Sequence, residues 1–293
     1  KALRDAVNAV NSGTSSYSYE GENIYLTADL NLKDEVWTPI GNADHPFKGN
    51  FEGWGHKIRN LKVEGSNDYA GLFGYIDGGS VRDMGVVRDV EVEGSVVAGK
   101  LYVGGICGYL KSGEISSCYS DIAVSGTQYV GGLCGYSEGK IENCWHQGNV
   151  TASKDSEVNA GGLVGDVNGG SLQRCFVINT AITVYDVNNN SYFGFIVGQC
   201  GSTEFLDDCR YDNDNKTVRM EGFKNGNDVT IGSKNGVGSP SKTTVIGATT
   251  AEMKTENYWT GVLNTEKNNP VWVIEDGSYP QLNSFCKNRD ITF

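Results

Sequence analysis

The chain has 293 residues, of which 40 are glycine and 5 are proline, without a Gly-x-y period, so a collagen-like helix is excluded. Its 24 basic and 36 acidic residues give a formal charge of −12. Such a surface repels phosphate backbones, and we expect no nucleic-acid partner. No apolar run approaches the ~18 residues of a spanning helix, so membrane contact is expected only through an anchor outside these residues.

The first predicted element is a short N-terminal helix over residues 1–12. In LRDAVNAV, Leu3, Ala6, Val7 and Val10 fall on one helical face. The first residues show no basic segment followed by an apolar one, as a secretory leader would have. We therefore expect any signal or anchor segment to lie outside this chain.

From residue 24 onward the chain is dominated by a repeat. Its core is Gly-apolar-apolar-Gly, and the closing glycines stand 27 to 34 residues apart. The five copies read YAGLFGYIDGGSVRDM, YVGGICGYLKSGEISSC, YVGGLCGYSEGKIENC, NAGGLVGDVNGGSLQRC and YFGFIVGQCGSTEFLDDC. A fixed period of this length is typical of a solenoid.

The eight cysteines follow the repeat. Cys118, Cys144, Cys175 and Cys209 hold one register, which Met84 occupies in the first copy, and Cys107 and Cys134 share another; Cys200 and Cys286 complete the set. Free cysteine behaves as a small, buried hydrophobe, and no C-x-x-C pair is present. We predict a ladder of buried thiols, the alternatives being disulfides or metal ligands.

The spacing and glycine content favour a parallel β-helix with about three strands per rung. Helical repeats need a 3.6-residue period, and propeller blades are usually longer than about 40 residues. Stacked rungs form their hydrogen bonds with each other and leave edges only at the two ends. The pattern does not assign which apolar residue of each Gly-apolar-apolar-Gly core points inward.

One copy contains a literal G-x-S-x-G motif, Gly135 to Gly139, with Ser137 in the nucleophile position. A nucleophile elbow requires a strand, a strained turn and then a helix. The equivalent stretches of the other copies have no serine there, and KIENCW, which follows Ser137, is predicted to be a strand. We therefore predict no catalysis by Ser137, and no catalytic residue is assigned.

The repeats resemble the GLUG motif, found in bacterial surface proteins and in the non-catalytic region of immunoglobulin-A-type metallopeptidases. The resemblance includes IYLTADLNL, WTPIG and FKGNFEGWGHKIRNLKV upstream, and TTAEMK and VWVIEDGSYPQL downstream. It implies a right-handed parallel β-helix that serves as an extracellular display or adhesion module without catalytic residues. The metallopeptidase members owe their activity to a separate domain with an H-E-x-x-H motif, and His45, His56 and His146 lack that spacing.

We therefore expect one all-β domain over 1–293, a right-handed parallel β-helix with two capped ends. Residues 1–23 form the short helical N-terminal cap, 24–215 the repeat solenoid, and 216–293 irregular last rungs and a C-terminal capping segment. Terminal rungs of solenoids need such cover. Thr249 or Thr250 is the predicted N-cap of a helix in the last segment.

Acidic and amide side chains cluster in DDCRYDNDNKT, residues 207–217, in the manner of a calcium loop. The twelve-residue EF-hand pattern fails, because Lys216 falls on a ligand position and the sixth position is not glycine. A solvated loop is the preferred interpretation, and we expect no cofactor. The alternative is an irregular structural calcium site formed by Asp207, Asp208, Asp212 and Asp214.

Aromatic residues recur at two registers and are the candidate ligand contacts. Tyr75, Tyr109 and Tyr136 follow core glycines, while Tyr119, Trp145 and Phe176 follow core cysteines. Because strand side chains alternate, a residue after an inward cysteine points outward. Outward aromatics could stack on sugar rings, or be covered by the longer loops. The candidate contacts are Tyr109, Tyr119, Tyr136, Trp145 and Phe176.

These features lead to the hypothesis of a non-catalytic, monomeric adhesion module. We expect it to be secreted or on the cell surface, outside the bacterial outer membrane, and to bind host-surface molecules, extracellular-matrix molecules or glycans. One alternative is a polysaccharide-active β-helix enzyme, a lyase or hydrolase, which would need charged residues converging on one rung face. Another is an accessory stalk of a larger, metallopeptidase-like surface protein.

Overall fold

The computed structural model describes most of the chain. The described stretches are 19–33, 35–65, 67–89, 96–153, 157–178, 180–185, 191–201, 206–212, 219–224, 227–229, 237–239, 246–259, 271–275 and 278–282, with single residues at 9, 12, 214, 263 and 284. Most of the predicted N-terminal helix and much of 216–293 lie outside these residues. None of the described helices is long and apolar enough to cross a membrane.

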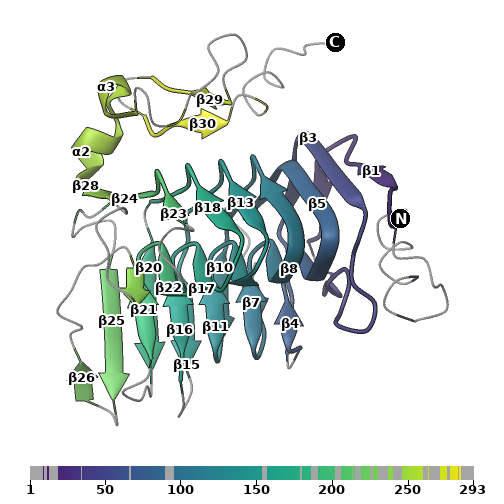
Figure 1. Ribbon diagram of the computed structural model, residues 1–293, viewed down its shortest axis with the longest axis horizontal. Coiled ribbons are helices and arrows are strands. Elements are labelled where there is room, and N and C mark those ends of the chain that lie inside the picture. Colours follow the sequence, from purple (N-terminus) through teal and green to yellow (C-terminus); the bar gives the residue numbers. More distant parts are fainter. Residues whose placement is uncertain are drawn as a thin grey trace.

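The chain winds into a parallel β-solenoid whose strands stack in three sheets (Figure 1). The largest sheet contains β1 (Asn23–Tyr25), β2 (Leu30–Asn31), β3 (Asn50–Arg59), β5 (Phe73–Val87), β8 (Cys107–Ser116), β9 (Tyr119–Asp121), β12 (Cys134–Ser137), β13 (Lys140–Glu142), β14 (Trp145–His146), β17 (Val164–Val167), β18 (Ser171–Gln173), β19 (Phe176–Val177), β22 (Val197–Cys200), β23 (Leu206–Asp207), β24 (Arg210–Asp212), β27 (Val237–Ser239) and β28 (Ile246–Ala248).

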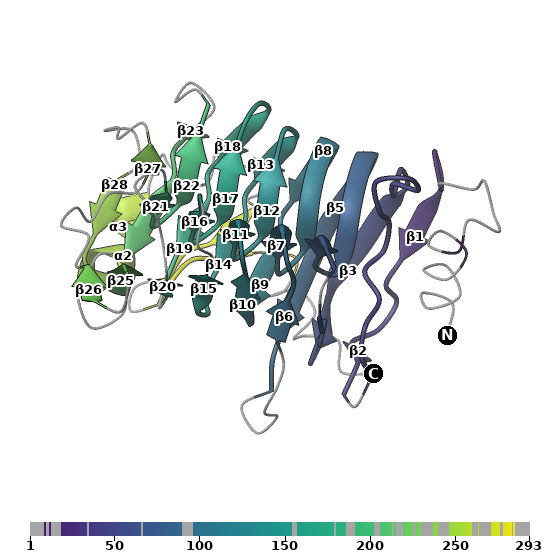
Figure 2. The same cartoon turned by 90° about the horizontal axis from the view of Figure 1, so that it is seen from below.

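Two smaller sheets close the rungs. One contains β6 (Val96–Ala98), β10 (Ala123–Gly126), β15 (Val150–Ser153), β20 (Ala181–Tyr185), β25 (Arg219–Lys224) and β26 (Asn227–Val229). The other contains β4 (Tyr69–Ala70), β7 (Tyr102–Gly104), β11 (Tyr129–Gly131), β16 (Asn159–Gly161) and β21 (Tyr192–Gly194). Seen from below, with the stack running across the view, equivalent strands of successive rungs lie side by side (Figure 2).

The copies of the repeat pair residue for residue. Cys134 on β12 pairs with Cys107 on β8 and with Val164 on β17, and both pairings are parallel. A middle rung contains five short strands, β11 to β15, rather than the three expected. The difference arises from sharp turns, including one at Asn143, whose φ of 53° separates β13 from β14.

The repeat core is a corner at which the chain turns from one sheet to the next. Ile106 and Cys107 are both fully buried, and so are Leu133 and Cys134. From the sequence, only one of the two apolar residues of each core could be expected to point inward, because neighbours on a strand point to opposite faces. In the structure the chain turns at this point, and both residues face the core. The corner has no room for a side chain at Gly131, where a Cβ would lie 2.1 Å from the carbonyl oxygen of Cys134.

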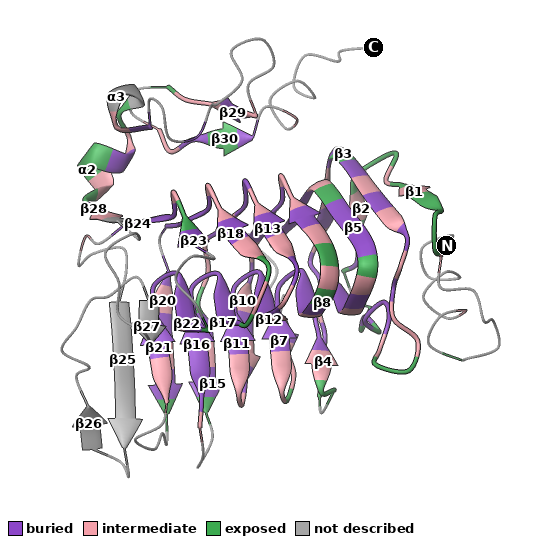
Figure 3. Ribbon diagram, viewed as in Figure 1, coloured by how far each residue is buried: buried purple, intermediate pink, exposed green. Residues whose placement is uncertain are grey.

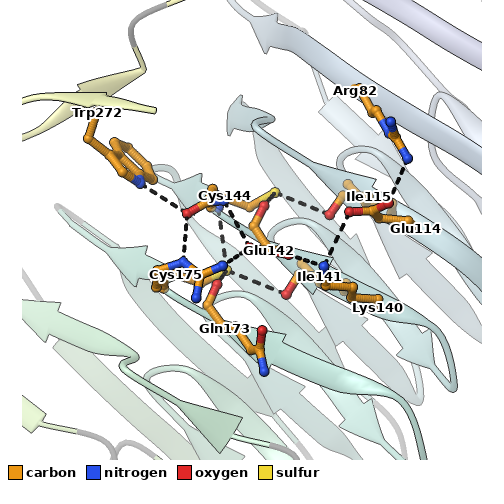
Figure 4. Close-up of polar contacts among 12 residues, drawn as sticks. Arg82, Glu114, Ile115, Lys140, Ile141, Glu142, Cys144, Gln173, Cys175 and Trp272 are labelled. Atoms are coloured by element: carbon orange, nitrogen blue, oxygen red, sulfur yellow. Dashed lines mark hydrogen bonds and ion pairs between the residues drawn. The ribbon is translucent and has the colours of Figure 1, made fainter. Parts of the chain in front are cut away.

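The predicted cysteine ladder is present. All seven described cysteines are buried free thiols. Cys144 Sγ lies 3.7 Å from the carbonyl oxygen of Ile115, and the Cys144 N–H donates to Cys175 Sγ across 3.4 Å (Figure 4). Burial raises the pKa of the Cys144, Cys175 and Cys209 thiols well above the usual value, so they behave as core side chains rather than nucleophiles.

The outer side of the same strands carries an ion-pair row. Arg82 and Lys140 both contact Glu114, and Lys140 also contacts Glu142 of its own strand (Figure 4). This alternation of buried inward and partly exposed outward residues repeats from rung to rung (Figure 3). The period-two pattern of the repeat therefore determines which residues reach the surface.

The C-terminal segment consists of α2 (Thr250–Met253), α3 (Glu256–Trp259), β29 (Trp272–Val273) and β30 (Gln281–Leu282). Thr249, one of the two predicted N-cap residues, is the N-cap of α2 and forms a capping box with Glu252. β28 pairs with β24 of the preceding rung, after which the segment runs back over the flank of earlier rungs (Figure 1). It therefore covers the side of the solenoid as well as adjoining its last described rung.

Candidate ligand-binding surface

Two tyrosines flank the Gly-Gly corner in successive copies of the repeat. In YVGGICGY, Tyr102 lies on β7 and Tyr109 on β8. The corner folds the two strands against each other, so their ring centroids lie only 5.3 Å apart and their planes are within 15° of parallel. Both side chains point outward and are half-buried.

Stacking of the rungs extends this pair into two columns of rings. Tyr102 stacks on Tyr69 and on Tyr129 with centroids 5.1 Å apart in both pairs, close to the ~4.8 Å between neighbouring strands. In the second column, Tyr109 meets Tyr75 and Tyr136 edge to face, at 4.8 and 4.9 Å. We refer to this group as the tyrosine surface: Tyr69, Tyr75, Tyr102, Tyr109, Tyr129 and Tyr136.

The phenol groups of the tyrosine surface remain protonated hydrogen-bonding groups. Partial burial raises the pKa of all six, to about 12 for Tyr129. The Tyr109 hydroxyl donates to Glu138, which Lys111 also contacts, and the Tyr136 hydroxyl accepts from Asn168 across 2.7 Å. The surface therefore combines rigid apolar rings with polar groups at its edge.

The two tyrosine columns end at a polar pair in the next rung. Asn159 takes the place of Tyr129, and Asp166 that of Tyr136. Asn159 Nδ2 donates to Asp166 Oδ2 across 3.1 Å and to Gln199 Oε1 across 2.6 Å. Burial is the main cause that raises the pKa of Asp166, to about 6, with Glu157 adding to the shift and the Asn159 hydrogen bond opposing it.

The sequence identified only part of this surface. Tyr109 and Tyr136 were predicted contacts, and both belong to it. Their partners Tyr69, Tyr102 and Tyr129 were missed, although each opens a copy of the repeat. That recurrence was the available signal, but only the corner geometry shows that the two tyrosines of each copy, six or seven positions apart, meet in space.

The second predicted row of aromatics does not form an open platform. Tyr119 stacks on Trp145 at 4.5 Å and within 3° of parallel, and Trp145 stacks on Phe176 at 6.0 Å. The rings cover each other's faces, and Phe176 is fully buried against Trp259 and Trp272 of the C-terminal segment. The prediction of a ligand contact is therefore wrong for Phe176, whereas Tyr119 and Trp145 line a cleft beside the C-terminal segment. The cover comes from the C-terminal segment.

Ser137 lies in an environment that differs from a nucleophile elbow. It ends β12, the next element is the strand β13, and its side chain is 1% exposed. Its hydroxyl donates to the carbonyl oxygen of Gly139 across 3.3 Å. The prediction of a strand after Ser137 is confirmed, and a buried hydroxyl in this position has no access to a substrate.

The acidic cluster does not converge. Asp207 is exposed, and Asp208 faces Arg210 at 3.5 Å. Asp212 is fully buried and accepts hydrogen bonds from Thr250 and Tyr279 and from the backbone N–H of Asp214. Among the described residues, no group of three or more His, Cys, Asp or Glu side chains is placed to hold a metal ion.

Comparison with known proteins supports the fold. No protein-family model matches the sequence, and no curated protein matches it either. The structure is similar to a crystal structure from Bacteroides ovatus described as a "putative immunoglobulin A1 protease", with a TM-score of 0.62 and 20% identity. The match covers 90% of this chain and 87% of that one. At this identity the likeness shows a shared solenoid fold.

Proposed function

We propose that the protein is a non-catalytic binding module that presents the tyrosine surface to host proteins or glycans outside the cell. The observation that carries the proposal is the group of six adjoining tyrosines, stacked at rung spacing and only half-buried. Tyrosine supplies a large amphipathic contact area with few rotatable bonds. Stacking restricts these rings before a ligand arrives, which lowers the entropy cost of binding.

The resemblance of the repeats to GLUG motifs supports an extracellular location, and the −12 charge of the chain suits a solvated surface module. The name of the Bacteroides ovatus neighbour supports a related possibility, in which the module is the accessory region of a larger metallopeptidase-like surface protein. In either arrangement the solenoid contributes binding rather than chemistry.

The proposal is tested by screening the protein against an array of glycans and extracellular-matrix proteins. The matched variants are Tyr102→Phe/Tyr129→Phe, which removes two hydroxyls and keeps the rings, and Tyr102→Ala/Tyr129→Ala, which removes the rings. We expect binding to fall about tenfold or more in the alanine variant, since hot-spot side chains typically contribute more than ~1–2 kcal/mol, and less in the phenylalanine variant.

Tyr185→Ala is the control, because Tyr185 is an exposed aromatic residue on β20, away from the tyrosine surface. Melting temperatures of all variants are measured alongside. A ligand whose affinity is the same for the wild type and the alanine variant, while both stay folded, would show that binding occurs elsewhere. A loss of ligand affinity in Tyr185→Ala as large as that in Tyr102→Ala/Tyr129→Ala would also contradict the proposal.

A further inference from the structure

A cleft separates the C-terminal segment from the flank of the solenoid and is independent of the tyrosine surface. Its volume is about 700 Å³, within the ~300–1,000 Å³ typical of small-molecule sites. Its floor contains Tyr119 on β9 and Trp145 on β14, and its other wall contains Tyr279 and Leu282 near β30. The cleft shares no residue with the tyrosine surface, although the long strand β5 contributes Tyr75 to one and Val87 to the other.

Cationic side chains gather at this cleft although the chain is strongly acidic. The cations Lys57, Arg59, Arg88 and Lys254 line it, together with the carboxylates Asp29 and Asp121. Arg59 is engaged with Asp29 at 3.1 Å and with Asp89 at 3.2 Å. Lys57, Arg88 and Lys254 form no ion pair with any carboxylate that the structure describes.

These charges occupy an ordered outer face. Lys57 pairs in register with Gly85, Gly85 with Tyr119, and Tyr119 with Trp145. Two residues further along the same strands, Arg59 pairs with Val87 and Val87 with Asp121. Gln147, the residue after β14, lies in the next rung beside Asp121. Cations thus stand at one end of the floor and aromatic edges at the other, with Asp121 and Gln147 alongside.

The side chains that line the cleft favour one class of anionic ligand over others. The faces of Tyr119 and Trp145 lie on each other at 4.5 Å, so a planar base has no open ring face on which to stack. Asp121 accepts a hydrogen bond from Gln147, and the Tyr279 hydroxyl donates to Asp212. Each keeps an oxygen that can accept a further hydrogen bond from a ligand hydroxyl. Three cations without a described ion-pair partner suit a single carboxylate, since Asp121 would repel a more highly charged group.

We propose that this cleft binds a sugar unit that carries a carboxylate, with Lys57 and Arg88 contacting the carboxylate and Asp121 and Gln147 contacting ring hydroxyls. Charged residues that converge on one rung face were the feature expected of the alternative, a polysaccharide-active enzyme, and this cleft brings such residues together. The site is separate from the tyrosine surface and does not depend on its function.

The experiment compares methyl β-D-glucuronide with methyl β-D-glucoside, which differ in a carboxylate at one carbon. Binding to the full chain is followed by NMR of the tryptophan indole signals, and Trp145→Phe identifies the Trp145 signal. We expect the glucuronide to shift that signal with millimolar affinity and to bind at least about fivefold more tightly than the glucoside, the effect of about one ion pair.

Lys57→Gln/Arg88→Gln is expected to reduce glucuronide affinity to that of the glucoside. Lys62→Gln, which removes an exposed lysine paired with Glu64 elsewhere, is expected to change nothing, and so is Tyr102→Phe/Tyr129→Phe. Equal affinity for both sugars, a Trp145 signal that moves with neither, or tighter binding of inorganic phosphate than of the glucuronide would overturn the proposal. Melting temperatures exclude unfolding as the cause.

Discussion

A single buried histidine occupies a register that holds serine in the preceding rung and valine in the next. His146 is fully buried, and its neighbours in the row are Ser120 and Val177. Its Nε2 lies 3.2 Å from the carbonyl oxygen of Gly148. Burial lowers its pKa to about 4 from the usual 6.5, against the opposite effect of its backbone contacts.

This shift makes His146 a source of acid sensitivity. The unfolded chain takes up a proton near pH 6.5, but the folded chain does so only near pH 4. Stability is therefore lost as the pH falls through that window, by up to about 3 kcal/mol. We expect His146→Val, which matches Val177 in the next rung, to become more stable relative to wild type as the pH falls from 7 to 4. Denaturant melts at several pH values measure this, and a difference independent of pH would contradict it.

Asp166 has the opposite effect on stability. Its folded-state pKa of about 6 lies above the usual 3.8, chiefly because of burial. The carboxyl group therefore costs stability once the pH rises through about 4 to 6. We expect Asp166→Asn to be more stable than wild type by about 1–2 kcal/mol at pH 8, and the gain to vanish near pH 4. The same denaturant series tests it, and a gain that grows toward low pH would refute it.

At the scale of elements, the C-terminal segment shields the outward aromatic row. Trp272 on β29 is 1% exposed, its ring lies 5.2 Å from Phe176, and its Nε1 donates to Asn143 Oδ1 across 3.2 Å. Trp259 packs on the same ring at 5.3 Å. Two indoles from one segment therefore complete a second hydrophobic cluster outside the solenoid core.

We expect Trp272→Ala to destabilise this segment by about 3–5 kcal/mol, the usual cost of removing a buried tryptophan side chain. Proteolysis should then cleave residues 250–282 sooner, while the solenoid retains its circular dichroism spectrum. Trp54→Ala is the matched control: Trp54 is 53% exposed, and its loss should cost under about 1 kcal/mol. Equal protease resistance of Trp272→Ala and wild type would show that the segment is not held by this contact.

The sequence predicted local repetition well and distant contacts poorly. Cys118, Cys144 and Cys175 occupy the same place in successive copies, so the buried ladder could be predicted directly from the aligned copies. Trp272 and Asn143 are 129 residues apart, and the repeat pattern contains no signal that predicts their contact. The outward direction of Trp145 was predicted correctly from strand alternation, but its cover depends on a segment whose path no repeat encodes.

For the whole molecule, the solenoid and the C-terminal segment that covers its flank (residues 249–282, here called the cover) contribute to stability in different ways. Each rung contacts mainly its neighbours along the stack, so stability accumulates rung by rung. The cover instead spans several rungs, since its cluster includes Val87, Tyr119, Phe176 and Ile178. Its removal should therefore expose apolar surface without unpairing the rungs.

We expect a chain ending at residue 248 to keep its β-sheet circular dichroism spectrum, because β28 still pairs with β24. Its melting temperature should fall by an amount on the order of 5 °C or more. Binding of a hydrophobic dye should increase, and Trp145 emission should shift to longer wavelength, because its row becomes solvated.

The control is Asp212→Asn in the same shortened chain. Buried Asp212 loses its partners Thr250 and Tyr279, and an uncompensated carboxylate alone would lower stability. If Asp212→Asn restores the melting temperature but dye binding stays high, the fall in melting temperature comes from the unpaired carboxylate, and the dye binding comes from the exposed flank. A shortened chain with unchanged dye binding and melting temperature would show that the flank is not covered in solution. Complete unfolding would show that the rungs depend on the cover.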